Sequence, residues 1–148
     1  MSAMLDTWIN AQTLPRGIGV DCVNIPELRA LNERTNGAFR LGTFTEAEQT
    51  EAENAPDPWV YLAGRFAAKE AVFKALSPLL PKSTFDFRRV ETLRQPDGSP
   101  RVTRSPWLLS LMKQAGVDDF LLSITHENPY AIAFSQAIQI RKSKECMP

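Results

Sequence analysis

Two acidic residues lie among apolar neighbours in this chain of 148 residues, where a charged carboxylate is costly unless something compensates its charge. Glu70 falls on the apolar side of the helical pattern WVYLAGRFAAKEAVFKAL at 59–76, about 40° from Phe66 at roughly 100° per residue. Asp21 sits in the strand-like run RGIGVDCVNI at 16–25. A lysine, an arginine or a metal ion could compensate either acid.

Each acid also has an interpretation that needs no active site. Lys74 lies four residues after Glu70, so the two can form a surface ion pair worth a few tenths of a kcal/mol. Asp21 can face water at a strand end or cap the following helix. Arg65 and Lys69 flank the same helical stripe and add positive charge to it. From these residues alone, both interpretations stay open.

The single histidine, His126, ends the strand-like run FLLSITH at 120–126. A lone histidine is more often a surface or satisfied side chain than a catalytic one, and the serines and acids form no recognisable triad pattern with it. The sequence contains no Gly-rich phosphate loop, no CxxC pair and no HExxH motif.

Helix and strand signals predict the elements that would position these residues. In the first half, capping and proline signals predict a strand over 16–25, a helix from Pro26 to about Asn36-Gly37, a short helix from the capping box at 45–48, and the long helix over 59–76. In the second half, they predict strands over 85–93 and 101–103, a helix over 106–115, and strands over 120–126 and 130–140. This order predicts an α+β fold, a single small domain whose antiparallel sheet packs on one long helix plus short helices.

The domain is expected over 15–140, with an N-terminal extension at 1–14 and a disordered tail at 141–148. The last predicted strand has one face made of small residues, Ala131, Ala133, Ser135 and Ala137. Such a face indicates that a helix or a second chain approaches closely.

Composition limits the classes of partner. The formal net charge is +0, so the chain lacks the overall positive field of nucleic-acid binders. No window approaches the ~20 apolar residues of a membrane span, and the start lacks a secretory signal. Cys22 and Cys146 are too few for a disulfide framework. We expect two reduced thiols in a cytoplasmic protein that binds neither nucleic acid nor membrane.

Several blocks together resemble the holo-[acyl-carrier-protein] synthase family, the small 4'-phosphopantetheinyl transferases. The blocks are GIGVD at 17–21, FTEAE at 44–48, GRFAAKEAVFKAL at 64–76, PDGSPRV at 96–102, SITH at 123–126 and YAIA at 130–133. The resemblance implies the fold of that family. It also implies transfer of the phosphopantetheine arm of coenzyme A to a serine of apo acyl carrier protein, with release of adenosine 3',5'-bisphosphate.

The resemblance also assigns roles at the reacting phosphate. Asp21 and Glu70 match the two acids that hold Mg²⁺, an ion that takes one or two protein carboxylates plus substrate and water oxygens. Either Glu70 or a metal-polarised water would take the serine proton. Lys74 matches the lysine on the pyrophosphate.

Other residues match the family's binding positions for its substrates. Arg65 and Lys69 resemble the basic residues near the nucleotide phosphates. His126 falls at the nucleotide end of coenzyme A, and Pro100 at the adenine pocket. The helix with Arg29 and Arg34 would meet the acidic carrier protein. Family members are typically homotrimers with sites shared between subunits.

Some positions depart from the family pattern. Asn24 and Glu27 replace a usual acid and a usual basic residue, Phe73 replaces a smaller or polar residue, Ser77 follows the lysine block, and Glu127 follows the histidine. These departures keep an alternative open, a catalytically weak or inactive module that binds a carrier protein with the same fold. A third interpretation is an unrelated metal-dependent phosphotransfer or hydrolytic enzyme that uses the same two acids.

Overall fold

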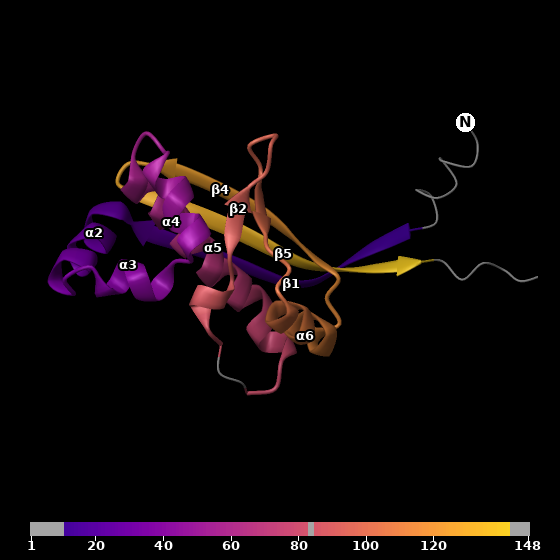
Figure 1. The fold of residues 1–148 in the computed structure, drawn as a ribbon. Coiled ribbons are helices and arrows are strands. Elements are labelled where there is room, and N and C mark those ends of the chain that lie inside the picture. The colour runs from indigo at the N-terminus through magenta and orange to yellow at the C-terminus, as the bar shows by residue number, and fades with distance from the viewer. Residues whose placement is uncertain (1–10, 83–84, 143–148) are drawn as a thin grey trace, which may run out of the picture.

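The computed structural model describes residues 11–82 and 85–142, and its helices and antiparallel strands form the α+β class of fold predicted from the sequence (Figure 1). The elements are β1 (Ala11–Asn24), α2 (Ile25–Arg34), α3 (Ala38–Thr43), α4 (Glu46–Glu53), α5 (Pro58–Leu76), η1 (Ser77–Leu79), η2 (Phe87–Arg89), β2 (Thr92–Arg94), β3 (Pro100–Val102), α6 (Pro106–Ala115), β4 (Asp119–Glu127) and β5 (Tyr130–Lys142). The short elements η1 and η2 are 3₁₀ helices.

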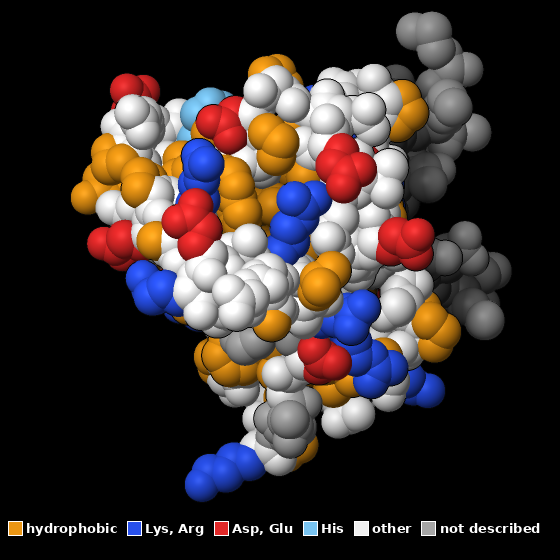
Figure 2. Space-filling view, turned by 60° about the vertical axis from the view of Figure 1, so that its left-hand side comes forward, with side chains coloured by type: hydrophobic (Ala, Val, Ile, Leu, Met, Phe, Trp, Pro, Cys, Tyr) orange, Lys and Arg blue, Asp and Glu red, His pale blue; other side chains and the backbone are white. Residues whose placement is uncertain are grey.

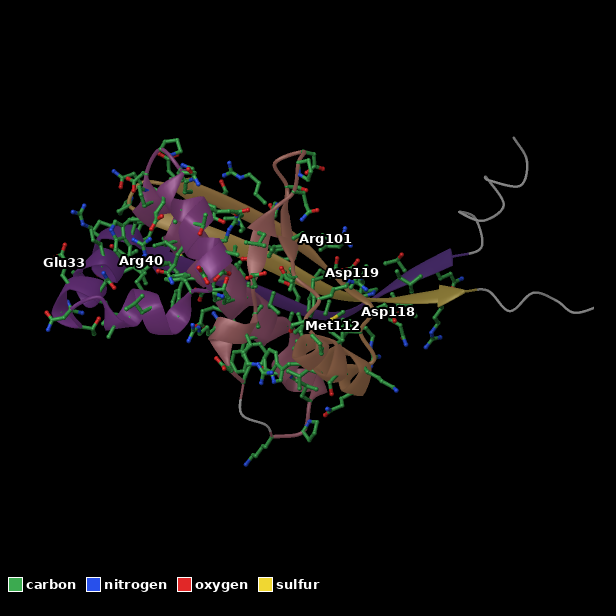
Figure 3. The ribbon with its side chains drawn as sticks, in the orientation of Figure 1. Glu33, Arg40, Arg101, Met112, Asp118 and Asp119 are labelled. Atoms are coloured by element: carbon green, nitrogen blue, oxygen red, sulfur yellow. The ribbon has the colours of Figure 1, made fainter. Side chains whose placement is uncertain are left out.

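The main sheet is antiparallel and ordered β1-β5-β4, while β2 and β3 form a separate hairpin. β5 lies in the middle and pairs with β1 and β4 along nearly their whole lengths (Figure 1). A side chain helps to join β4 to β5: Asp118, just before β4, accepts a hydrogen bond from the backbone N–H of Ile140 at 2.6 Å (Figure 3).

The two long strands exceed the predicted domain bounds. β1 begins at Ala11, inside the segment predicted as an extension, and β5 continues to Lys142, inside the segment predicted as a tail. These ends are each other's ladder partners, so each is ordered by a segment that is distant in sequence. The remainder of both predicted segments, 1–10 and 143–148, lies outside the described residues.

Helix α5 lies across one face of the sheet and approaches β1 so closely that two positions require glycine. A Cβ atom at Gly17 would lie 2.0 Å from the carbonyl oxygen of Ala75, and one at Gly19 would lie 1.8 Å from that of Ala71. The buried face of β5 is the predicted small-residue face, Ala131, Ala133, Ser135 and Ala137. The close partner of that face is therefore a helix of the same chain. Asp21 follows Gly19 by two residues and so faces the same helix.

Local signals set the starts of the helices as predicted. Asn24 accepts a hydrogen bond from the amide of Glu27 at the start of α2, and Asp57 accepts from two amides at the start of α5. Thr45 and Glu48 form the complete capping box of α4. Each cap satisfies amide groups that the first helical turn leaves without partners.

Two local predictions are wrong. The alternation over 85–93 predicted a strand, but the segment forms η2 and only its last residues enter β2. Phe85 packs instead on Phe73 and Trp107, with ring centroids 4.9 and 5.5 Å away, so its apolar side chain is partly buried without a strand. Helix α3 was not predicted, because its N-cap Gly37 makes no side-chain cap.

The apolar stripe predicted for α5 is only partly correct. Trp59, Phe66 and Phe73 are only partly buried. The buried residues surround most of the helix: Leu62, Ala63, Gly64, Arg65, Ala67, Ala68, Lys69, Ala71, Val72, Ala75 and Leu76. Glu70 is half-buried and lies at the margin of this surface. Its carboxylate therefore borders the core instead of facing into it.

Candidate active site

The structure brings the two predicted metal acids together. Asp21 on the inner face of β1 and Glu70 on α5 line one open pocket of about 490 Å³. Burial raises the pKa of the Glu70 carboxyl, the charge of Asp21 raises it further, and the ammonium of Lys74 opposes both. The effect of the Asp21 charge on the Glu70 pKa shows that the two carboxylates are close enough to interact, as two ligands of one cation would be.

Lys74 belongs to the same cluster, but its partner differs from the simplest expectation. Its ammonium lies 2.9 Å from the Asp21 carboxylate and 3.0 Å from the carbonyl oxygen of Val20. The i,i+4 ion pair with Glu70 is not the contact that forms. Lys74 therefore links α5 to β1 at the point where the acids meet.

The donor set of this cluster fits a magnesium ion. Among the residues that the structure describes, no group of three or more His, Cys, Asp and Glu side chains could hold a metal ion. Two carboxylates are nevertheless what Mg²⁺ commonly takes from a protein, because substrate phosphates and water supply its other ligands. Asp21 and Glu70 would hold such an ion, and its charge would neutralise phosphate oxygens.

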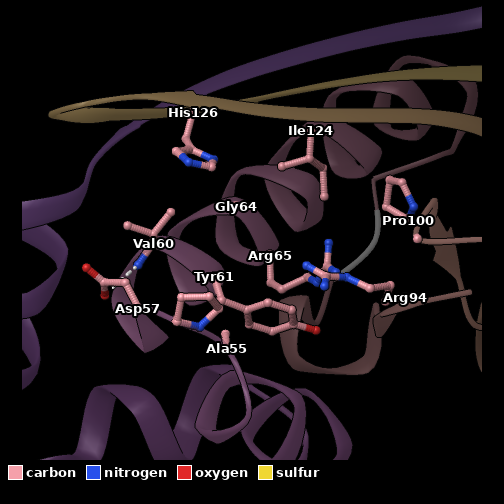
Figure 4. Close-up of a pocket in the computed structure, with 12 residues that line it drawn as sticks. Ala55, Asp57, Val60, Tyr61, Gly64, Arg65, Arg94, Pro100, Ile124 and His126 are labelled. Atoms are coloured by element: carbon pink, nitrogen blue, oxygen red, sulfur yellow. Dashed lines mark hydrogen bonds between the residues drawn. The ribbon is translucent and has the colours of Figure 1, made fainter.

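A second pocket, of about 380 Å³, contains three of the predicted nucleotide-binding residues. Arg65 of α5, Pro100 of β3 and His126 of β4 all line it (Figure 4). Its remaining lining residues come from α5, β4, the hairpin and the loop before α5: Ala55, Pro56, Asp57, Val60, Tyr61, Gly64, Arg94, Gly98 and Ile124. A pocket with an apolar floor and a buried guanidinium suits a base and its phosphates.

Sequence reasoning missed Tyr61 and Arg94 in this pocket. Tyr61 lies four residues before Arg65 on α5, and the guanidinium carbon of Arg65 lies 4.4 Å from the centre of the Tyr61 ring. The i,i+4 spacing of an aromatic and an arginine is a signal that could have found it. Arg94 reaches the pocket through the hairpin, and no local pattern indicates that.

Lys69 does not line either pocket, which contradicts its predicted place near the nucleotide phosphates. Its side chain is 0% exposed and its ammonium lies 2.8 Å from the equally buried carboxylate of Glu48. It also donates a 2.7 Å hydrogen bond to the carbonyl oxygen of Val90. Burial raises the pKa of Glu48 and lowers that of Lys69, and their attraction opposes both shifts. Lys69 joins α5 to α4 and to the segment before β2.

This buried pair predicts a stability defect without a binding defect. We expect Lys69→Met to lower the free energy of unfolding by about 3–5 kcal/mol, because it leaves the Glu48 carboxylate buried and unpaired. Urea unfolding at one fixed protomer concentration would measure this, with Lys113→Met on the exposed side of α6 as the control. A stable Lys69→Met protein that binds a nucleotide more weakly would instead restore the predicted phosphate role.

The two pockets share no lining residue and lie on different sides of α5. Asp21 is on β1 and His126 is on β4, and these are the opposite edge strands of the main sheet. One protomer therefore presents the acids at one edge and the nucleotide-type pocket at the other.

The predicted partner-binding arginines project from α2. Arg34 borders the pocket of the two acids, and Arg29 borders a groove that His126 also lines. Arg29 is exposed and pairs with Glu33 at 3.4 Å, so its charge is partly offset. Positive and negative side chains are interspersed over the face in Figure 2, in keeping with the zero net charge.

Comparison with known proteins gives the class to which this fold and site belong. The family model of the 4'-phosphopantetheinyl transferase superfamily matches residues 17–135. A holo-[acyl-carrier-protein] synthase of Desulforudis audaxviator is 37% identical over 122 residues, which cover 82% of this chain and 92% of that protein. The chain therefore belongs to this superfamily of transferases and, within it, to the holo-[acyl-carrier-protein] synthase family.

Solved structures agree with this assignment. The holo-[acyl-carrier-protein] synthase of Neisseria meningitidis superposes with a TM-score of 0.75 at 31% identity and covers 84% of this chain and 98% of its own. That of Helicobacter pylori, in complex with coenzyme A, superposes with a TM-score of 0.69 at 25% identity and covers 81% of this chain and 98% of its own. The predicted fold class is thus confirmed.

Proposed function

We propose that this enzyme transfers the 4'-phosphopantetheine arm of coenzyme A to a serine of an apo acyl carrier protein, with Mg²⁺ held by Asp21 and Glu70. The observation that carries the proposal is the meeting of Asp21 and Glu70 in one pocket, with the Lys74 ammonium paired to Asp21 beside it. Similarity to synthases named for the carrier protein, one of them bound to coenzyme A, supports both substrates.

The reaction needs positioning and charge neutralisation more than covalent chemistry from the protein. The serine oxygen attacks the β-phosphorus of the coenzyme A pyrophosphate, and the bond from that phosphorus to the bridging oxygen breaks, which releases adenosine 3',5'-bisphosphate. Glu70 or solvent takes the serine proton. Lys74, whose ammonium lies 2.9 Å from Asp21, would stabilise the charge on the departing phosphate.

The direct test is mass spectrometry of an apo acyl carrier protein after incubation with this chain, coenzyme A and Mg²⁺. We expect the carrier to gain the mass of one phosphopantetheine arm and adenosine 3',5'-bisphosphate to appear in equal amount. An unchanged carrier mass, in a panel where a control transferase works, would contradict the proposal. Carrier binding without coenzyme A affinity would favour the inactive binding module.

A homotrimer with sites between subunits is part of the proposal. The sheet face opposite α5 exposes apolar side chains from all three strands, with exposed fractions of 65% for Ile18, 40% for Phe134 and 52% for Leu121. Such a contiguous face indicates contact between copies of a chain. Separate half-sites at opposite sheet edges suit a head-to-tail ring, in which one protomer's acids meet the next protomer's pocket.

The arginines of α2 are proposed to orient the acidic carrier protein beside the two acids. We expect Arg29→Glu with Arg34→Glu to raise the KM for the carrier by about tenfold at low salt, with the difference shrinking as salt rises. Steady-state kinetics at several salt concentrations would measure this. Arg88→Glu with Lys113→Glu makes the same charge change on η2 and α6 and serves as the control. Equal KM values for both double variants would place the docking surface elsewhere.

No helix among residues 11–82 and 85–142 is long and apolar enough to cross a membrane. A cytoplasmic location is proposed from the two unpaired cysteines expected from the sequence.

A further inference from the structure

The guanidinium of Arg65 is deeply buried but is not closely paired with a carboxylate. The side chain is only 6% exposed, yet its nearest carboxylate oxygen, on Glu51, lies 3.9 Å from a terminal nitrogen. Its Nε atom is buried and makes no hydrogen bond within the described part of the chain. A buried donor without a partner is costly, and Arg65 lines the pocket, so the orphaned N–H indicates a missing acceptor.

Glu51 stays at this distance because other groups hold its carboxylate. The Tyr61 hydroxyl donates a hydrogen bond to Glu51 Oε2, and the backbone N–H of Arg94 lies 3.2 Å from each carboxylate oxygen. Both donors compete with Arg65 for the same oxygens. Glu51 thus joins α4, α5 and β2, but it does not close on the arginine.

Tyr61 contributes its ring as well as its hydroxyl. The ring lies under the guanidinium at 4.4 Å, which fixes the plane of Arg65 by stacking. Burial and the hydrogen bond to Glu51 raise the pKa of Tyr61 to about 12, although the hydrogen bond and positive charge of Arg65 oppose the shift, so the hydroxyl keeps its proton and remains a donor at neutral pH. The arrangement of these residues around the pocket is visible in Figure 4.

We propose that Tyr61 is a positioning residue for Arg65: its hydroxyl restrains the competing Glu51 carboxylate and so keeps the guanidinium free for a phosphate of the coenzyme A nucleotide. This rests on the proposed function. Without the hydroxyl, Glu51 can rotate onto Arg65 and form a close ion pair, which an incoming phosphate must then displace.

The test combines Tyr61→Phe, Glu51→Gln and the double variant. Calorimetry gives the Kd for coenzyme A, and kinetics gives KM and kcat. We expect Tyr61→Phe to raise Kd and KM for coenzyme A by about tenfold, which is the affinity that one charge-assisted hydrogen bond contributes. The kcat at saturating coenzyme A should change by less than about twofold. Glu51→Gln in the Tyr61→Phe background should return Kd to near the wild-type value, because it removes the competing charge.

Glu51→Gln alone separates positioning from a structural role. It should leave the Kd for coenzyme A unchanged or lower it, whereas loss of a structural link between α4 and β2 would raise it. Glu53→Gln, on the same helix, is the matched control, since the Glu53 side chain is 70% exposed and pairs only with Arg40 among the described residues. Adenosine 3',5'-bisphosphate should show the Tyr61→Phe defect, and adenosine, which lacks phosphate, should not.

Three results would overturn the proposal. If the wild-type chain binds coenzyme A and Tyr61→Phe binds it with the same Kd, the proposed function stands but Tyr61 has no positioning role. A Tyr61→Phe defect that Glu51→Gln does not rescue would show that the hydroxyl acts only through the fold. A wild-type chain that neither binds coenzyme A nor modifies a carrier would remove the proposed function and this proposal together.

Discussion

Glu70→Gln should abolish metal-dependent transfer while leaving the fold intact. We expect kcat/KM to fall by on the order of 10³-fold, because a bound metal supplies several kcal/mol of charge stabilisation and each ~1.4 kcal/mol is tenfold in rate. The amide is nearly isosteric, and the half-buried Glu70 side chain makes no hydrogen bond among the described residues that the change would remove. Mn²⁺ or Mg²⁺ affinity, measured by calorimetry, should fall in parallel.

The control for Glu70→Gln is Glu53→Gln, which makes the same chemical change at an exposed position of α4. Unfolding midpoints equal to that of the wild-type protein would show that neither change damages the fold. A Glu70→Gln enzyme with wild-type rates and wild-type metal affinity would remove Glu70 from the site, whatever the geometry of Asp21 beside it.

The same residue should give metal binding a pH dependence. Burial and the Asp21 charge raise the pKa of Glu70, and metal binding requires the deprotonated carboxylate. Metal affinity should therefore fall as the pH drops through this raised pKa, at a higher pH than for an exposed glutamate. Lys74→Met removes the opposing positive charge, so the fall should move to still higher pH. A metal titration at a series of pH values would show the shift.

Local chemistry in the sequence predicted most of the fold. The caps at Asn24, Asp57 and Ser105 are short-range contacts between a side chain and nearby amides, so they can be read from adjacent residues. The segment at 85–93 could not be predicted this way, since Phe85 is partly buried against Phe73 and Trp107, which lie in distant segments.

The site was predicted less evenly, and two residues of one helix show why. Arg65 and Lys69 are one helical turn apart and looked alike in the sequence, but only Arg65 opens into a pocket. Glu48 of α4 forms an ion pair with Lys69, and its carboxylate also accepts a hydrogen bond from the backbone N–H of Thr92 in β2. Residues outside α5 decide which of the two basic side chains is buried in an ion pair, so the spacing of residues within α5 cannot predict it.

Two of the departures from the family pattern, Asn24 and Ser77, have structural roles of their own. Asn24, where the family often has an acid, serves as the N-cap of α2 and lines the pocket of the two acids. Ser77 continues α5 into the 3₁₀ helix η1, so the chain turns there without glycine. Neither departure disturbs Asp21, Glu70 or Lys74, which still meet. The inactive-module interpretation thus has no support from these two positions.

The separation of the two pockets makes a strong prediction about mixed oligomers. If each site joins Asp21 and Glu70 of one protomer to Arg65 and His126 of the next, two inactive variants should repair one another. We expect Glu70→Gln alone to be inactive, and Arg65→Met to lose on the order of 10²-fold in kcat/KM, because it removes charge-assisted contacts to phosphate.

Co-refolding equal amounts of the Glu70→Gln and Arg65→Met chains should then restore about a quarter of wild-type activity. In a head-to-tail ring with random mixing, half of the sites receive an intact Glu70, and half of those receive an intact Arg65 from the neighbour. Native mass spectrometry would verify the mixed trimers, and mixing the folded variants without subunit exchange should restore nothing. Verified mixed trimers without activity would show that both half-sites act within one protomer and that the active site is not shared between neighbours.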